Sequence, residues 1–235
     1  MKQQLEQPQL TKKARILSKT QILTTDLQED RGLSIGECKT IVTAPIIPIR
    51  EKTYYRVIYE TGLRPIEALS LQIEDLNKLT GEMAARKVKG KRNRFMQETT
   101  YKIRYVIVSP RTIELLKTLI GNRKKGSIFI TDKGLAFKSI RYMEKQLNKF
   151  AGLLSIQKLR RYRVDNGATL PLITLMSLRK AGERHHDAAG GDSSLSAQAS
   201  GHTMKTKIQY YQNDVKWDEV HNSYKANHPA FNQDW

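Results

Sequence analysis

An arginine stands between two apolar patterns in the stretch Tyr59–Leu71, YETGLRPIEALSL. Arg64 precedes Pro65, and proline is favoured in the first turn of a helix, where backbone N–H groups lack intrahelical acceptors. Anions are stabilised at such a position, and a guanidinium adds a planar fork that binds two phosphate oxygens at once. The pattern therefore predicts a phosphate-binding site. An ion pair between Arg64 and Glu67 on the helix surface is the alternative.

Other reactive side chains form weaker patterns. His185 and His186 precede Asp187, but adjacent helical residues point about 100° apart, which is a poor geometry for one metal ion. Ser193 and Ser194 lack the Gly-x-Ser-x-Gly spacing of a nucleophile elbow. The sequence also has no phosphate-binding loop motif and no acidic cluster of the two-metal kind. We therefore expect no metal and no cofactor.

Two helices are expected to meet at Arg64 and to position it. Gly62 suits the position that follows a helix, because glycine adopts the left-handed conformation found there. Pro65 then opens the next helix. Further upstream, Ser34 and Glu37 have the spacing of a capping box. The apolar stripe of the helix that begins at Pro65 consists of Ile66, Leu69, Ile73 and Leu76.

Strands are expected next. Residues 82–95 and 101–109 resemble two strands joined by a basic turn, and 126–131 are expected to form a short third strand. Between them, Ser109 and Pro110 have the types that open a helix. The sheet should therefore follow the Arg64 junction directly.

The C-terminal half resembles helices joined by polar connectors. Residues 138–154 are amphipathic, whereas 157–172 read as a basic connector. Residues 173–212 read as helical pieces broken at Gly190–Gly191 and near Gly201.

The composition favours a polyanionic partner. The chain has 235 residues, is 39% hydrophobic and carries 41 Lys and Arg against 23 Asp and Glu, for a net charge of +18. This imbalance favours nucleic acid, and a basic surface kept for solubility is the alternative. Cys38 is the single cysteine, and no segment is apolar enough to be a signal peptide or to span a bilayer. We expect an intracellular protein, cytoplasmic or nucleoid-associated, with no membrane partner.

The junction around Arg64 resembles the first arginine motif of the tyrosine recombinases, also called phage-type integrases. That motif runs Thr-Gly-Leu-Arg-x-x-Glu-Leu, followed by a hydrophobic helix and an acidic residue. The position after the glutamate, usually leucine, is Ala68 here. The matching residues are Thr61, Gly62, Leu63, Arg64, Glu67, Leu71 and Asp75.

The resemblance extends to three later residues. The family has a second arginine, then a Gly-His pair and then a tyrosine. Arg179 lies 23 positions before His202, and Tyr211 lies nine positions after it, as is typical of the family. Tyr210 is the alternative to Tyr211, one position away. The match covers residues 33–212, the catalytic domain of the family.

The resemblance implies a catalytic role for each of these residues. Arg64 and Arg179 would clamp the non-bridging oxygens of the scissile phosphate, and His202 would hydrogen-bond the same group. Tyr211 would be the nucleophile. A lysine from the β-hairpin would protonate the leaving 5′-oxygen.

The lysine and two further positions are less regular. The family often has Gly-Lys at the hairpin turn, so Lys91 fits best, with Lys89 as the alternative. The family's His-x-x-Arg box has Met176 in place of its histidine, and methionine cannot relay a proton. Lys180 stands where a histidine often follows the arginine. Glu67 is expected to orient Arg64, and Met176 is expected to impair activity.

The resemblance also implies a domain organisation. Residues 33–212 would form an α+β domain, mostly helical, with a small antiparallel three-stranded sheet. Residues 1–32 are expected to form a basic N-terminal arm that contacts phosphates, with a solvated tail as the alternative, and 213–235 a tail that can pack on a neighbouring subunit. Members usually carry a DNA-clamping domain before the catalytic one. We therefore expect either a catalytic-domain-only member or a separate DNA-clamping partner.

These features predict a site-specific DNA recombinase or integrase. It would cut and rejoin double-stranded DNA through a 3′-phosphotyrosyl intermediate, as a homotetramer on two DNA sites. One alternative is a DNA-binding protein that keeps the fold with reduced or no catalysis. A second is a relaxing enzyme like the type IB topoisomerases, and a third is a basic RNA-binding protein.

Overall fold

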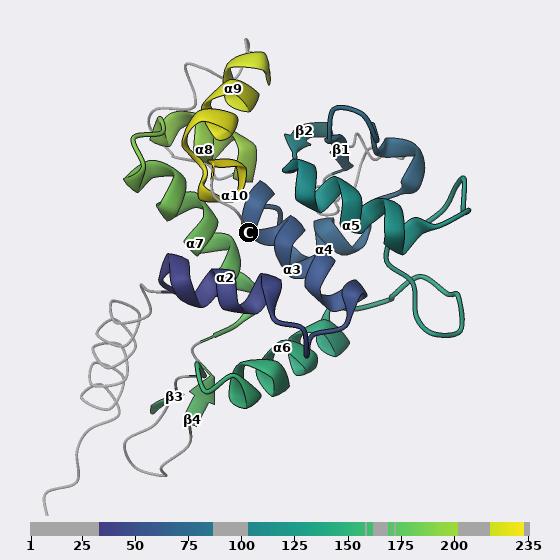
Figure 1. Ribbon diagram of the computed structural model, residues 1–235, viewed down its shortest axis with the longest axis vertical. Coiled ribbons are helices and arrows are strands. Elements are labelled where there is room, and N and C mark those ends of the chain that lie inside the picture. The colour runs from purple at the N-terminus through teal and green to yellow at the C-terminus, as the bar shows by residue number, and fades with distance from the viewer. Residues whose placement is uncertain are drawn as a thin grey trace, which may run out of the picture.

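The chain folds mostly into helices with two small antiparallel sheets (Figure 1). The computed structural model describes residues 33–86, 103–157, 159–161, 169–171, 173–201 and 217–232. The first elements are α2 (Ile35–Thr43), α3 (Ile49–Thr61), α4 (Pro65–Leu69), the 3-10 turn η1 (Ile73–Asp75), β1 (Glu82–Arg86), β2 (Ile103–Ile107) and α5 (Pro110–Ile120). The later elements are α6 (Arg141–Leu153), β3 (Leu159–Arg161), β4 (Thr169–Pro171), α7 (Leu175–Ala188), α8 (Ser193–Ser200), α9 (Trp217–Asn227) and α10 (Pro229–Asn232).

Helix α3 lies at the centre of the fold and packs against α2, α5 and α7 (Figure 1). Its tyrosines are buried, and their hydroxyls bond to neighbouring elements. The Tyr54 hydroxyl donates to the Pro65 carbonyl at 2.7 Å, and the Tyr55 hydroxyl donates to the Met143 carbonyl at 3.0 Å. A buried aromatic ring whose hydroxyl has an acceptor combines apolar burial with a directed contact. Tyr54 thereby ties the start of α4 to the core.

Local sequence signals set the helix ends as expected. Ser34 and Glu37 form the capping box of α2, with both reciprocal hydrogen bonds present. Gly62 caps α3 in the left-handed conformation, at φ 61°, and Pro65 is the first residue of α4. The Ser109 side chain accepts from the backbone at the start of α5. These boundaries are confirmed. The sequence predicts them because helix ends of this kind depend only on neighbouring residues.

The expected third strand is wrong. Among the described residues, the sheet next to the Arg64 junction consists of β1 and β2, and residues 126–131 make isolated bridges. The Ile73 N–H donates to the Gly126 carbonyl at 2.9 Å, and the Ile128 N–H donates to the Leu71 carbonyl at 3.0 Å. The segment 126–131 therefore pairs with the chain that follows α4 and does not add a strand to β1 and β2.

The same pairing shortens the helix that begins at Pro65. Helix α4 ends at Leu69, because the backbone beyond it turns to bond with the loop after α5. Ile73 and Leu76 are nevertheless buried, as the apolar stripe predicts. The periodicity therefore identifies the buried positions correctly and overestimates the length of the helix.

Strands β1 and β2 form the expected hairpin. They pair antiparallel, with Glu82 opposite Ile107 and Arg86 opposite Ile103. Met83, Ala85 and Val106 point into the core, which agrees with the alternation of a half-buried sheet.

The C-terminal half contains a second strand pair and two further helices. The basic connector at 157–172 contains a second antiparallel pair, β3 with β4. The polar tail contains two helices, α9 and α10, and Val220 and Tyr224 of α9 are buried against Ile107 and Ala199. These few apolar side chains are enough to dock the tail on α7, α8 and β2 of the same chain.

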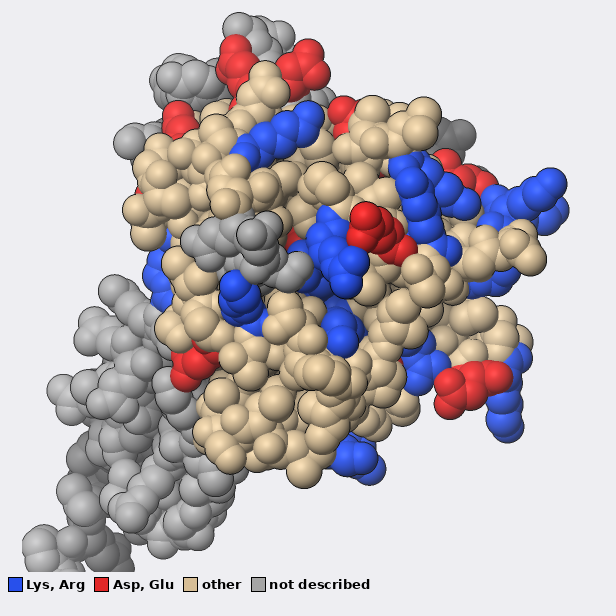
Figure 2. Space-filling model, in the orientation of Figure 1, with Lys and Arg blue, Asp and Glu red and all other residues tan. Residues whose placement is uncertain are grey.

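The surface is strongly basic on the face shown in Figure 2. Lysine and arginine side chains spread over its middle and right, with few acidic groups among them, and its lower part is largely uncharged. Within the described ranges, none of the helices combines the length and the apolar character that crossing a bilayer requires.

Candidate active site

Arg64 occupies the joint between α3 and α4. Gly62 ends α3 and Leu63 is fully buried, which holds the chain on both sides of the turn. The Arg64 side chain is 40% exposed. Because α4 has only five residues, the guanidinium rather than the helix dipole supplies the positive charge here. Arg64 can therefore present free guanidinium edges to a phosphate.

Glu67 holds Arg64 in place through two hydrogen bonds. Its carboxylate accepts from the Arg64 backbone N–H at 3.0 Å and from the Arg64 Nη1 at 3.0 Å. The Glu67 side chain is 2% exposed, so this ion pair is shielded from water on the carboxylate side. The spacing of three residues places the two side chains on one face of the helix start. The ion pair and a phosphate-facing guanidinium are therefore compatible in one structure.

Arg179 lies on α7 and is buried. Its Nε donates to Glu183 Oε1 at 3.2 Å, and its Nη2 donates to the Ser200 carbonyl at 2.9 Å. Burial lowers the pKa of Arg179, Glu183 opposes this shift, and Arg64 and Arg104 lower the pKa further. An arginine keeps its charge under such perturbation. Because both of these partners, Glu183 and Ser200, pack against Gly62 two residues before Arg64, Arg64 and Arg179 lie at one site.

The packing of Gly62 brings α3, α7 and α8 together at this site. A Cβ placed on Gly62 would lie 3.1 Å from the Ser200 Cβ and 3.5 Å from Glu183 Oε1. Glycine therefore allows the end of α3 to approach both the Arg179 partner and the end of α8. The structure thus brings Arg64 and Glu67 together with Arg179, which lies more than a hundred positions later in the sequence.

Arg104 is a third guanidinium at this site, and the sequence reasoning missed it. Its Nη2 donates to Glu67 Oε2, and its Nη1 donates to the Ala199 carbonyl at 2.9 Å. Burial lowers the pKa of Arg104, Glu67 raises it, and Arg64 lowers it. The available signal was the alternation of the strand, because Arg104 shares its inward-facing parity with Val106. A basic residue at an inward position needs an acidic partner.

The side chains at this site form an arginine cluster of three guanidiniums and two carboxylates, with a net charge of +1. The members are Arg64, Arg104, Arg179, Glu67 and Glu183. A phosphodiester carries one negative charge, so the balance suits a single backbone phosphate.

Met176 and Lys180 lie on α7 beside Arg179 and are exposed. The Met176 side chain is 42% exposed, in the first turn of α7. It has no ionisable group, so it offers this face of the site no proton donor or acceptor of its own.

Five other candidate residues lie outside the described residues: Lys89, Lys91, His202, Tyr210 and Tyr211. Their surroundings in the sequence are nevertheless informative. Gly201 caps α8 and is the residue before His202 in the sequence, so the described chain reaches the arginine cluster one position before this histidine. The connection from β1 to β2 contains both lysines.

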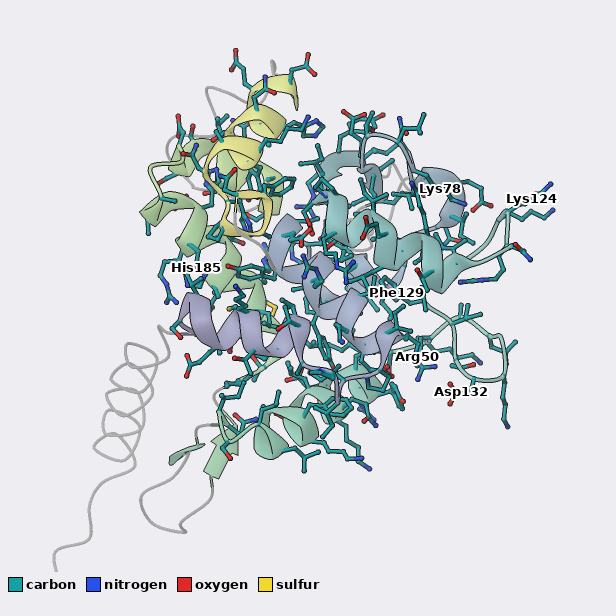
Figure 3. The ribbon with its side chains drawn as sticks, viewed as in Figure 1. Arg50, Lys78, Lys124, Phe129, Asp132 and His185 are labelled. Carbon is teal, nitrogen blue, oxygen red and sulfur yellow. The ribbon has the colours of Figure 1, made fainter. Side chains whose placement is uncertain are left out.

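The two histidines of α7 face different neighbours, and Figure 3 shows His185 near α2. His185 Nδ1 lies 2.9 Å from the Tyr59 hydroxyl and Nε2 lies 3.0 Å from the Leu33 carbonyl. His186 Nε2 lies 3.1 Å from the Ser223 hydroxyl. The two rings thus bond to different parts of the fold and act as packing residues.

A hollow of about 530 Å³ lies at the opposite end of α3. Figure 3 shows Arg50 beside Asp132 there, and the two form an ion pair at 2.6 Å. Arg50 also pairs with Glu51 and lies over the rings of Phe137 and Tyr142. The length of α3, about 20 Å for 13 residues, separates this hollow from Arg64. It is not part of the arginine cluster.

Comparison with known proteins identifies the family. The model of the phage integrase family matches residues 33–216, which is most of the chain. A comparison with curated proteins finds no significant match.

Solved structures share the fold. XerA recombinase has 19% identity and a TM-score of 0.55, with 82% of this chain and 63% of that chain covered. XerH site-specific recombinase bound to its difH substrate has 22% identity, a TM-score of 0.54 and coverages of 80% and 51%. The integrase from mycobacterium phage Brujita has 13% identity, a TM-score of 0.59 and coverages of 94% and 74%. The chain thus spans less than two thirds of the two Xer recombinases. With the fold of the tyrosine recombinase catalytic domain and a family match over most of its length, this chain belongs to the phage integrase family.

Proposed function

We propose that this protein is a site-specific DNA recombinase or integrase that cuts and rejoins DNA through a 3′-phosphotyrosyl intermediate. The observation that carries the proposal is the convergence of Arg64 and Arg179, with Glu67, next to the segment that leads to His202. Family membership and the net charge of +18 support DNA as the substrate.

The arginines would act on the scissile phosphate. Attack on a phosphodiester adds negative charge to the non-bridging oxygens, and guanidiniums stabilise that charge while binding in a directed, bidentate manner. Tyr211 would be the nucleophile, with Tyr210 as the alternative. A phenol has a pKa near 10, so neighbouring positive charges favour the phenolate that attacks.

The remaining roles are assigned by the family resemblance. His202 would hydrogen-bond the phosphate, and Lys91, or else Lys89, would protonate the leaving 5′-oxygen as a general acid. The phosphotyrosyl bond would retain the energy of the phosphodiester. Rejoining would then need neither ATP nor another cofactor.

A trapping experiment tests this chemistry. A binding site is first selected from random duplexes by affinity for the purified chain, and nicks are then introduced into it so that a cleaved strand cannot be rejoined. The wild type and Tyr210→Phe are expected to form a covalent adduct with this DNA, and Tyr211→Phe is expected to form none. Adduct formation with Tyr211→Phe but not with Tyr210→Phe would reverse the assignment of the nucleophile.

A second candidate function is DNA binding without turnover. It is favoured by Met176 at the usual histidine position and by the Glu183 carboxylate bonded to Arg179. Tight binding to the selected site without any adduct would establish this function and exclude the recombinase. Relaxation of supercoiled plasmid by the monomer would instead favour a topoisomerase-like activity.

The assembly proposed for catalysis is a tetramer on two duplexes, in which residues 213–235 reach a neighbouring subunit. A separate DNA-clamping partner is proposed for the face of the duplex that the catalytic domain leaves open. A chromosomal substrate would associate the protein with the nucleoid. Band shifts that distinguish one-site from two-site complexes test the tetramer.

A further inference from the structure

Two segments of the arginine cluster converge on the Arg104 side chain, which extends from β2. Arg104 Nη2 donates to Glu67, the carboxylate that also holds Arg64. Arg104 Nη1 donates to the Ala199 carbonyl at 2.9 Å, three residues before His202. One side chain therefore links the start of α4, the hairpin strand and the end of α8.

The end of α8 is held by two guanidiniums at consecutive residues. Arg104 bonds the Ala199 carbonyl, and Arg179 bonds the Ser200 carbonyl at 2.9 Å. The last carbonyls of a helix have no intrahelical partner and carry partial negative charge, so cationic donors stabilise them. The direction in which the chain leaves α8 is thus fixed from two sides.

Gly201 makes the contact with Arg104 sterically feasible. A Cβ at this position would lie 2.5 Å from Arg104 Nη1, and Gly201 has φ 68°, a conformation that favours glycine. Any larger residue would have to displace the guanidinium. The close approach of Arg104 therefore explains why the residue before His202 is a glycine.

We propose that Arg104 is a positioning residue for DNA cleavage. It fixes the Arg64 guanidinium and the chain leading to His202 relative to one another, through Glu67 and the Ala199 carbonyl. Its side chain is 11% exposed and both of its Nη atoms donate to protein acceptors, so its observed contacts are with the protein groups that it positions. This inference rests on the proposed function, because cleavage is the step that the positioning serves.

The first measurement needs no activity. Hydrogen exchange of the backbone amides is compared between the wild type, Arg104→Gln and a control, Arg86→Gln. Arg86 lies on the adjacent strand β1, and its exposed side chain pairs with Asp75 of η1. Amides of residues 198–201 are expected to exchange about tenfold faster in Arg104→Gln only, since the end of α8 loses one of its two ties. Unchanged exchange there overturns the inference.

The second measurement separates binding from cleavage on the nicked site. Arg104→Gln is expected to lower the single-turnover rate of adduct formation about 100-fold, because small misplacement of catalytic groups is costly. Its Kd for DNA should change less than about threefold, the scale of a single lost long-range charge in salt. Arg104→Lys keeps the charge but directs only one hydrogen bond, and should remain about tenfold slow. A wild-type rate in Arg104→Lys would show that charge alone matters.

A double-mutant cycle tests the link to Gly201. Gly201→Ala should slow cleavage, and Gly201→Ala combined with Arg104→Gln should be less slow than the product of the two single effects. Strictly multiplicative effects would contradict a shared contact. If the wild type forms no adduct, the proposed function fails, and the exchange measurement alone decides whether Arg104 organises the end of α8.

Discussion

Arg64 and Glu67 are joined by two hydrogen bonds, one from the Arg64 backbone and one from its guanidinium, both 3.0 Å long. The backbone bond caps α4, and the side-chain bond aims the guanidinium. Glu67 is buried, whereas the Arg64 side chain is 40% exposed. One edge of the guanidinium is thus fixed by the protein while the others stay accessible to a phosphate. Stability and substrate binding therefore depend on the same carboxylate.

Replacing this carboxylate is expected to destabilise the protein. Glu67→Ala removes the shared acceptor of Arg64 and Arg104, and breaking a buried ion pair costs about 3 kcal/mol. Glu114→Ala is the control, because its pair with Arg111 is exposed and such pairs contribute less than about 1 kcal/mol. Urea unfolding measures both. Equal midpoints for the two variants would show that Glu67 is not a structural anchor.

Removing the charge of Glu183 is expected to strengthen DNA binding. The carboxylate lies beside Arg179, and its negative charge opposes an incoming phosphate. Glu183→Gln keeps an acceptor for Arg179 and should tighten binding about five- to tenfold at low salt, with a smaller gain at high salt. Glu114→Gln makes the same charge change on the exposed face of α5. If both variants tighten binding equally, net charge and not the site is responsible.

Restoring a histidine at position 176 is expected to increase activity. Met176 lies in the first turn of α7 and is 42% exposed, so an imidazole fits without repacking the core. A general acid or base typically contributes about 100-fold or more. Met176→His should therefore raise the rate of adduct formation at least about tenfold, with an unchanged Kd for DNA. Met176→Leu is the control and should behave as the wild type; a gain there would point to helix packing.

Sequence rules located the parts of this fold that depend on adjacent residues. The Ser34 capping box, the Gly62 cap and the start of α5 at Pro110 were all predicted correctly. The family spacing also singled out Arg64 and Arg179, which the structure places in one cluster.

Features that depend on distant partners were not predictable in this way. The strand alternation marks Arg104 as inward-facing, but its place in the site depends on Glu67 and Ala199, 37 and 95 positions away. The buried ion pair of Arg56 with Glu60 was missed as well, although the two residues lie one turn apart, because its burial depends on α5. The missing third strand has the same cause: the partner of a β-like segment is set by the tertiary fold.

Acid is expected to destabilise the docking of the C-terminal helices. The pKa of His228 is lowered from 6.5 to about 3, mainly by burial and in part by nearby His186. Its Nδ1 accepts from the Ala230 N–H at 3.2 Å, so Nε2 carries the proton and donates to the Tyr59 carbonyl at 3.2 Å. Protonation of Nδ1 would break the first of these bonds. The neutral ring is therefore the form that fits.

The sign of the pH dependence follows from this shift. Below pH 6.5 the unfolded chain binds a proton at His228, whereas the folded chain binds it only near pH 3. The free energy of unfolding therefore decreases as the pH is lowered from about 6.5 to about 3. One such proton contributes a slope of about 1.4 kcal/mol per pH unit. His228→Leu should reduce the slope by about this amount in urea unfolding between pH 7 and 4. The same slope in both proteins would show that protonation of His228 does not contribute to the pH dependence of the free energy of unfolding.

The docked tail leads to the last prediction, which separates assembly from DNA binding. Val220 and Tyr224 of α9 are buried against Ile107 and Ala199 of the same chain, whereas the proposed tetramer requires this segment to reach a neighbour. Deleting 213–235 should abolish two-site complexes and leave one-site binding within about threefold, because the arginine cluster is built by other elements. The measurement is a band shift with one or two labelled duplexes.

The matched control for this deletion removes only residues 233–235, which keeps α9 and α10 intact. It should form both complexes at wild-type levels. Equal loss of one-site and two-site binding after the longer deletion would contradict an assembly role, and would mean that α9 supports the DNA-binding surface itself. Thermal unfolding of both deletions distinguishes this from loss of the fold, since removing α9 uncovers an apolar cluster and should lower the Tm by several degrees.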